Sequence, residues 1–304
     1  MNHTSRTESN SVTSRWCPDR WAYAFTLPAW VLTALTLVIP IAVVVLMSFT
    51  DYALGNTEFE WVGWANYEAL VFNEDFLHAL LNTLGYVLLV VPASVAIGLL
   101  LAVLVESIRV GKRLYRTIFF LPVASTLVAM AIVWKYLLHD TIGPVNLLLH
   151  ALGFEGFGFF SDPDMVLESL AVIGVWQLAG FNMVLFMAGL CGIPSEVNDA
   201  ATLDGADGFG RRLVTVTLPL LSPTMLFVVT TSSMTAFKLF DTVAVLTRGG
   251  PQGASDVLLY STYREGFENL NTAGAASMTV VFLILIVTGS WLQARLSEKK
   301  VHYR

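Results

Sequence analysis

Charged residues are scarce in this chain. Asp, Glu, Lys and Arg make up only 13% of its 304 residues, whereas 55% are hydrophobic. A soluble domain usually carries about 25% charged residues, so the composition excludes an ordinary soluble enzyme and predicts a polytopic membrane protein. The few bases form no basic stripe or aromatic-basic platform, which leaves nucleic-acid binding without a basis.

Cysteine is also rare. Cys17 lies in a polar tail and Cys191 at the end of an apolar segment, so they support neither a disulfide framework nor a metal site. The five histidines have no spacing typical of metal ligands, and the acidic residues cluster in loops without forming a catalytic pair. We therefore expect a protein that is not an enzyme and has no cofactor of its own.

A phosphate-binding loop is missing as well. The only Gly-Lys pair is Gly111-Lys112. A P-loop would require Gly at position 106 and Ser or Thr at position 113, but these positions hold Glu106 and Arg113. The chain is not expected to bind ATP through such a loop.

Long apolar runs are the main positive feature. Runs of about 20 apolar residues predict membrane-spanning helices, and six occur, at 23–49, 79–105, 114–138, 166–190, 218–246 and 272–294. The first run is too long for the core of a signal peptide and lacks a small-residue cleavage site. We expect an all-α integral membrane protein with a six-helix domain over 23–294 and short tails at 1–22 and 295–304.

The positive charges predict the orientation of these helices. Lys and Arg collect in cytoplasmic loops and tails of membrane proteins. Thirteen of the 17 bases lie in alternate segments: Arg6, Arg15, Arg20, Arg109, Lys112, Arg113, Arg116, Arg211, Arg212, Arg295, Lys299, Lys300 and Arg304. The opposite loops contain only Arg248 and Arg264, and the stretch 51–75 has six acids and no base. Both termini are therefore expected in the cytoplasm.

The cytoplasmic loop at about 192–217 carries an unusual polar helix. Ser195 is a suitable N-cap, Glu196 and Asp199 place negative charge near the helix start, and Gly205 is suited to its end. A helix of about nine residues is marginal alone in water, so a docking partner would stabilise it. From spacing alone, an ordinary amphipathic connector is an equally good interpretation.

The same loop resembles a known signature. The residues from Asp199 to Ala206, followed by Leu218-Pro219, are similar to the coupling loop of permease subunits in binding-protein-dependent ABC importers, with Asp199 where that family usually has Glu. The resemblance implies the type I importer permease fold. It also assigns contact with an ATPase to Glu196, Asp199, Ala200, Ala201, Asp204, Gly205 and Ala206.

Shorter matches extend this resemblance over nearly the whole chain. They are Val62–Tyr67, Asn82–Leu84, Arg116–Pro122 with Trp134, Phe240-Asp241, Leu246-Thr247 and Gly249–Pro251. Each match is weak, but their order and spacing together are typical of the family.

The family resemblance implies the partners. They are a second homologous permease, a homodimeric cytoplasmic ATPase that binds the ATP, an extracytoplasmic solute-binding protein and the lipid of a bacterial inner membrane. The outer segment 139–165 contains a short amphipathic helix at 145–152, which either receives the binding protein or caps the bundle.

The substrate is less well defined by the sequence. Residues 263–267 and 298–304 resemble the first permease subunit of glycerol-3-phosphate importers, which implies glycerol 3-phosphate or a glycerophosphodiester. A disaccharide or oligosaccharide remains an alternative. A secondary transporter that works without ATP would need internal repeats or broken helices, and no convincing repeat relates the two halves.

Polar residues inside the apolar runs are candidates for the transport path. An ionisable residue at membrane depth usually faces the protein interior. Lys238 and Asp241 are three residues apart and would share a helix face, either as a self-neutralising pair or as a polar lining in which Lys238 binds phosphate. Gln177 and Asn182 are further candidates on the fourth segment.

Overall fold

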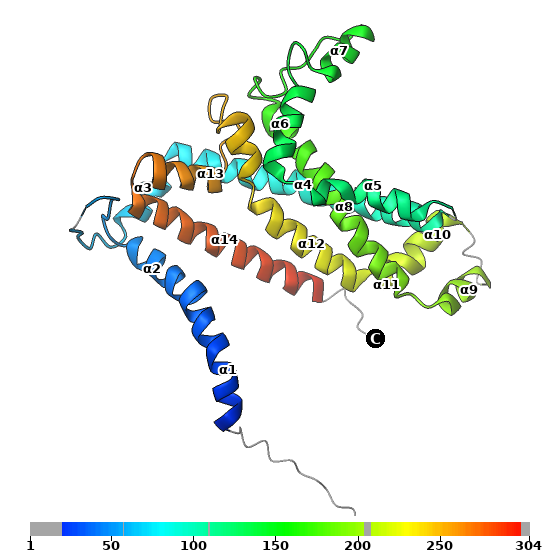
Figure 1. Cartoon of the computed structure of the whole chain (residues 1–304), viewed down its shortest axis with the longest axis horizontal. Coiled ribbons are helices and arrows are strands. Elements are labelled where there is room, and N and C mark those ends of the chain that lie inside the picture. Colours follow the sequence, from blue (N-terminus) through cyan, green and yellow to red (C-terminus); the bar gives the residue numbers. More distant parts are fainter. Residues whose placement is uncertain (1–19, 57, 109, 204–207, 299–304) are drawn as a thin grey trace, which may run out of the picture. The chain divides into compact units, whose positions relative to one another are not determined.

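A computed structural model describes residues 20–56, 58–108, 110–203 and 208–298 of the chain (Figure 1). The chain divides into two compact units, Met1–Leu46 and Met47–Arg304. Asp204, Gly205 and Ala206, which the sequence analysis predicts to contact an ATPase, lie outside the described residues, as do most of the two tails.

The first unit is one apolar helix with a local irregularity. It comprises α1 (Arg20–Thr33), a π-helical turn (Ala34–Val38) and α2 (Ile39–Met47). The apolar part, Phe25–Met47, is 23 residues long. About 20 residues cross the hydrocarbon core of a bilayer, so this helix is long enough to span it.

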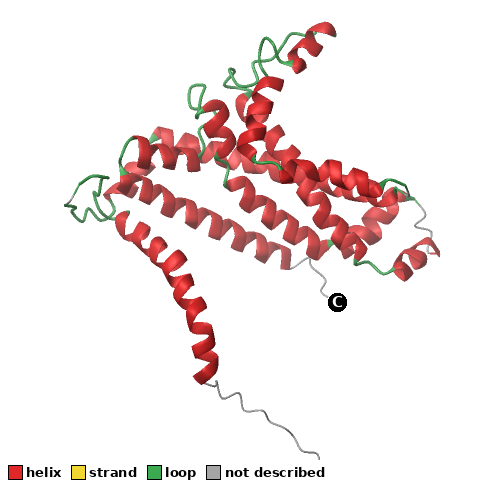
Figure 2. Ribbon diagram, in the orientation of Figure 1, coloured by secondary structure: helices red, strands yellow, loops and turns green. Residues whose placement is uncertain are grey.

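The second unit is also helical, and Figure 2 shows helices joined by loops, with no strand drawn in the part of the chain that is described. Its elements are α3 (Ala65–Val71), α4 (Glu74–Ser107), α5 (Lys112–Ala124), α6 (Leu127–Leu137), α7 (Pro144–Ala151), α8 (Val166–Cys191), α9 (Ser195–Leu203), α10 (Phe209–Arg212), α11 (Leu218–Leu220), α12 (Ser222–Phe237), α13 (Leu258–Tyr263) and α14 (Thr272–Glu298). Three π-helical segments, Leu213–Thr217, Val243–Thr247 and Arg264–Glu268, lie between them.

Two of the predicted spans are broken. The third, predicted as 114–138, consists of α5 and α6 bent by 100° relative to each other, and the fifth bends by 77° between Gly210–Leu220 and Ser222–Phe237. Pro122 lies in the last turn before the first break and Pro223 in the first turn after the second; proline lacks the N–H that continues a helix. The described residues thus contain four uninterrupted helices long and apolar enough to cross a membrane, or six spans if each bent pair is one.

Three helices of the second unit form its core. Helices α4, α8 and α12 contact one another, and their buried side chains include Val90, Met183, Phe186 and Val228. Figure 1 shows α9, α10 and the start of α5 at one end of this unit, and α3 and α13 towards the other. The basic residues at the start of α5 and in α10 therefore lie at one end of this unit, and the acidic residues around α3 lie towards the other end.

The matched residues 62–67 have a structural role. The Asn66 side-chain amide donates hydrogen bonds to the carbonyl oxygens of Ser48 and Thr50, at 2.9 and 2.7 Å, and the Tyr67 hydroxyl lies 2.6 Å from the Ser48 hydroxyl. These bonds satisfy backbone groups where the chain leaves α2, so this motif anchors a loop.

Candidate functional site

A cavity of about 210 Å³ lies among α4, α6, α8, the end of α12 and the segment that follows it. Its wall contains three of the predicted path residues, Gln177, Lys238 and Asp241. The other lining residues are Tyr86, Leu127, Ile173, Gly174, Leu178, Thr235, Ala236, Leu239, Phe240 and Thr242. Residues far apart in the sequence thus form one chamber with mostly apolar walls and a few polar groups, as is usual for a small-molecule site.

Lys238 and Asp241 reach this cavity in an unexpected way. Helix α12 ends at Phe237, Lys238 is its C-cap, and the chain is non-helical at residues 239–240 before Asp241 begins the next helical turn. The prediction that the two residues share one helix face is therefore wrong. Both residues nevertheless line the cavity, on either side of the non-helical stretch.

These two charges form no ion pair with each other or with any residue that the structure describes. The alternative of a self-neutralising pair is therefore absent from this structure. The Gln177 amide likewise has no hydrogen bond to the described part of the chain. Lys238 and Asp241 are exposed and Gln177 is half-buried, so these groups are open to water or to a polar ligand.

Asn182 has a different position from the other path candidates. It does not line the cavity and is fully buried between helices. Its amide nitrogen donates to the Ser94 hydroxyl at 3.3 Å, and its oxygen accepts from the Ser232 hydroxyl at 3.0 Å. Gly98 permits this packing, since a β-carbon there would lie 2.6 Å from the Asn182 β-carbon. Asn182 therefore connects α4, α8 and α12.

Tyr86 and Gly174 belong to the cavity wall, although the sequence analysis does not single them out. A β-carbon at residue 174 would lie only 2.1 Å from the Tyr86 hydroxyl oxygen. The glycine at position 174, inside an apolar helix, was the sequence feature that could have identified this contact, because small residues mark close approach between membrane helices.

Aromatic rings continue from the cavity wall to α13. The Phe240 ring contacts Tyr260 and Tyr263, with centroid distances of 6.0 and 5.3 Å, and Tyr263 stacks on Phe267 at 5.3 Å. Tyr260 is buried whereas Phe267 is 70% exposed. The cavity wall is thus packed directly against the segment that follows the Gly249-Gly250-Pro251 turn.

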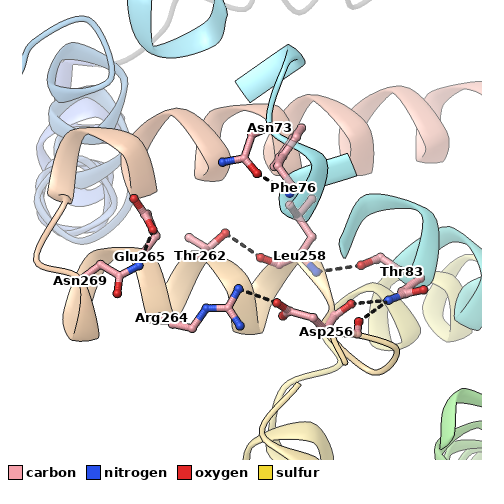
Figure 3. Close-up of polar contacts among 11 residues, drawn as sticks. Asn73, Phe76, Thr83, Asp256, Leu258, Thr262, Arg264, Glu265 and Asn269 are labelled. Carbon is pink, nitrogen blue, oxygen red and sulfur yellow. Dashed lines mark hydrogen bonds and ion pairs between the residues drawn. The ribbon is translucent and has the colours of Figure 1, made fainter. Parts of the chain in front are cut away.

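That segment is held by residues of a second matched motif. The Asn82 amide donates hydrogen bonds to the carbonyl oxygens of Gly253 and Asp256, at 3.1 and 2.9 Å. The Leu258 backbone N–H donates to the Thr83 hydroxyl at 2.9 Å (Figure 3). Two motifs about 170 residues apart in the sequence therefore form one structural unit beside the cavity.

An ion pair completes this unit. The Arg264 guanidinium lies 2.7 Å from a carboxylate oxygen of Asp256 (Figure 3), and Asp256 is almost fully buried. Burial raises the pKa of the Asp256 carboxyl, and the nearby Arg264 guanidinium only partly opposes this shift. The pair ties the loop after the Gly-Gly-Pro turn to the helical segment Arg264–Glu268.

The predicted coupling helix forms as α9, Ser195–Leu203. Its described side chains divide into two faces, with Val197 partly and Ala201 almost fully buried, and Glu196, Ala200 and Leu203 exposed. Leu203 is 89% exposed. Asp199 lies within this helix. The outward face combines a carboxylate, a small residue and an apolar side chain.

The predicted helix at 145–152 is also present, as α7. Inside it, Asn146 is buried and fastens the returning loop: its amide donates to the carbonyl oxygens of Asp140 and Phe157, at 2.9 and 2.8 Å, and its oxygen accepts from the Phe157 N–H at 2.9 Å. Leu147, Leu148 and Leu152 remain exposed. The helix thus presents an apolar surface away from its own loop.

Comparison with known proteins reveals relatives of this architecture. A chain of a bacterial ABC transporter that imports the acidic polysaccharide alginate is similar in fold, with a TM-score of 0.82 and 21% identity, over 93% of this chain and 96% of that chain. The alginate transporter in complex with an alginate pentasaccharide-bound periplasmic protein gives a TM-score of 0.81 and 21% identity, over 92% and 94%.

Sequence relatives are similar over most of their length. The sn-glycerol-3-phosphate transport system permease protein UgpA of Yersinia enterocolitica is 31% identical over 95% of this chain and 96% of its own. Its counterpart from Agrobacterium fabrum is 31% identical over 80% and 83%. The family model described as "binding-protein-dependent transport system inner membrane component" matches residues 94–302.

These relatives are permease proteins, which confirms the prediction of a transport subunit rather than an enzyme. Since the family model matches most of its length, the chain, with its apolar helices, belongs to the family of inner-membrane permease components of binding-protein-dependent ABC importers.

Proposed function

We propose that this chain forms half of the translocation pathway of an ATP-driven importer of glycerol 3-phosphate or a glycerophosphodiester. The observation that carries the proposal is the cavity in which Lys238 has no ion-pair partner among the described residues. The substrate class agrees with the relatives named as sn-glycerol-3-phosphate permeases.

The cavity residues suit such a substrate. The Lys238 ammonium is a compact charge with three donors, which can neutralise a phosphate. Gln177 offers both donors and an acceptor, and the Asp241 carboxylate accepts hydrogen bonds from hydroxyl groups. The wall thus combines one cationic position with acceptors, which matches a molecule that carries a phosphate at one end and hydroxyls at the other.

The proposed topology has six spans with both termini in the cytoplasm. The separation of charge supports it: basic residues at the start of α5 and in α10 lie at the same end of the second unit as α9 (Figure 1). In this topology the exposed face of α9 meets the ATPase. A leucine that is 89% exposed on a nine-residue helix favours a protein partner there, because so short a helix is marginal by itself.

The complete importer would contain a second homologous permease, two copies of the ATPase that bind ATP, and an extracytoplasmic binding protein. The exposed leucines of α7 are our candidate contact for the binding protein. Closure of the ATPases would move α9, and the broken third and fifth spans would allow the helices around the cavity to rotate.

The proposal is tested with the purified complex of both permeases and the ATPase, reconstituted in vesicles. Binding protein loaded with glycerol 3-phosphate should stimulate ATP hydrolysis, and Gly205→Pro should abolish the stimulation while the subunits still co-purify. Stimulation by a loaded disaccharide instead would favour the alternative substrate. The importer function would be refuted if no ATPase co-purified with the wild-type permease.

A further inference from the structure

Tyr86 is a buried side chain of the cavity wall that carries a polar group. It belongs to α4, is only 4% exposed, and packs in the same core cluster as Val90, Leu170 and Leu178. The cavity is also lined by Tyr86. Its ring is therefore held by the core while its surface borders the chamber that contains Lys238.

The Tyr86 hydroxyl is not one of the fully enclosed polar atoms without a partner, so it keeps some accessible surface, yet it has no hydrogen-bond partner among the described residues. Buried tyrosine hydroxyls usually have one, and an unsatisfied buried donor costs free energy. Ser94 and Ser232, the buried serines of α4 and α12, are bonded to Asn182. The contents of the cavity that Tyr86 lines can supply this partner.

Gly174 determines where this hydroxyl lies. A β-carbon at position 174 would be 2.1 Å from the hydroxyl oxygen and 3.1 Å from the ring carbon that bears it. Any larger residue would displace the ring. Glycine thus allows α8 to approach α4 so closely that the phenol end of Tyr86 lies against Gly174, and both residues line the chamber.

We propose that the Tyr86 hydroxyl forms a hydrogen bond with a hydroxyl group of the substrate and makes the permease select hydroxyl-bearing substrates over their deoxy analogues. This inference rests on the proposed function. Lys238 carries the charge that attracts the phosphate end, and Tyr86, on a different helix of the same chamber, contacts the neutral end. A site built around a hydrogen bond rejects analogues that lack the hydroxyl, because its own polar group is then left unpaired.

The test compares transport of three phosphates by reconstituted complexes with loaded binding protein. They are glycerol 3-phosphate, 3-hydroxypropyl phosphate, which lacks the hydroxyl on C2, and 2-hydroxypropyl phosphate, which lacks the terminal hydroxyl. The wild-type complex should prefer glycerol 3-phosphate over at least one analogue. In Tyr86→Phe, the ratio of kcat/KM for glycerol 3-phosphate to kcat/KM for that analogue should fall by about five- to tenfold. Because the binding protein is unchanged, a change in this ratio reports on the permease.

The matched control is Tyr67→Phe, which also removes one phenol hydroxyl. The Tyr67 hydroxyl is bonded within the protein, to Ser48, so its loss should leave the ratio unchanged. Gly174→Ala, which displaces the Tyr86 ring, should lower the ratio as Tyr86→Phe does and serves as the second variant.

The outcomes separate the two proposals. If the wild-type complex transports glycerol 3-phosphate and both Tyr86→Phe and Gly174→Ala keep the wild-type ratio, the role of Tyr86 is overturned and the proposed function stands. If the wild-type complex transports none of the phosphates, the proposed function fails and the Tyr86 inference fails with it.

Discussion

Ser232 on α12 donates a hydrogen bond of 3.0 Å to the side-chain oxygen of Asn182 on α8, and neither residue is exposed. Because Asn182 also donates to Ser94 on α4, one amide links the three core helices. Replacing Asn182 with leucine should therefore reduce stability by about 1 kcal/mol, since each of its two hydrogen bonds between membrane helices contributes about 0.6 kcal/mol on average. Thermal unfolding in detergent measures the loss. Unchanged substrate selectivity is expected, and altered selectivity would argue that Asn182 contacts substrate.

The contact between Tyr86 and Gly174 predicts a rescue. Gly174→Ala places a β-carbon 2.1 Å from the Tyr86 hydroxyl oxygen, so it should lower the yield of folded protein. Adding Tyr86→Phe removes the clashing oxygen and should restore part of the yield. The yield is measured by size-exclusion chromatography of the single and double variants. A double variant no better folded than Gly174→Ala alone would contradict the close approach of α4 and α8.

Lys238 should set the affinity for the phosphate group. Lys238→Met removes the charge but keeps the length of the side chain, and loss of a charge-assisted hydrogen bond should raise the KM for glycerol 3-phosphate about tenfold or more. The control is Lys135→Met, because Lys135 is exposed on α6 and does not line the cavity. An unchanged KM for Lys238→Met at normal expression would exclude Lys238 from substrate binding.

The ion pair of Asp256 and Arg264 should stabilise the loop beside the cavity. Arg264→Gln leaves the buried Asp256 carboxylate unpaired, so we expect a loss of about 2 kcal/mol, less than for a fully buried pair because Arg264 is partly exposed. The double variant Asp256→Asn with Arg264→Gln should be more stable than Arg264→Gln alone, since no buried charge remains. Thermal unfolding of the wild type, both single variants and the double variant completes the cycle. Additive losses would show that the two residues do not interact.

The exposed face of α9 should hold the ATPase. Leu203→Asp introduces a charge where we expect an apolar contact, so the amount of ATPase that co-purifies should fall severalfold. Leu152→Asp is the matched control, since Leu152 is a similarly exposed leucine beside α7. Equal retention of the ATPase by both variants would place its docking surface elsewhere.

Local features of the sequence predicted much of the architecture. The fourth and sixth apolar runs coincide with α8 and α14, and the start signals at Ser195 and Glu196 correspond to the start of α9. These predictions depend only on residues close together in the chain. Apolar length, helix capping and charge near a helix start are properties of a short segment, so no tertiary contact was needed to recognise them.

The breaks in the third and fifth spans were harder to predict. Pro122 and Pro223 were visible in the sequence, but membrane helices often tolerate proline when neighbouring helices satisfy the freed backbone groups. Whether a proline kinks a span or ends it depends on what packs beside it. For the same reason, the spacing of Lys238 and Asp241 could not reveal that α12 ends at Phe237 and that a non-helical stretch separates the two residues.

The sequence by itself determined the class of this protein: a shortage of charge, long apolar runs, one-sided positive charge and a polar helix with the coupling-loop pattern all act locally and can be read locally. Only the tertiary structure decided which polar residues work together. It placed Asn182 in the helix packing and assembled Tyr86, Gly174, Gln177, Lys238 and Asp241 around one cavity. The physical reason is that the role of a polar side chain depends on the groups that lie beside it, and here those groups come from helices far apart in the chain.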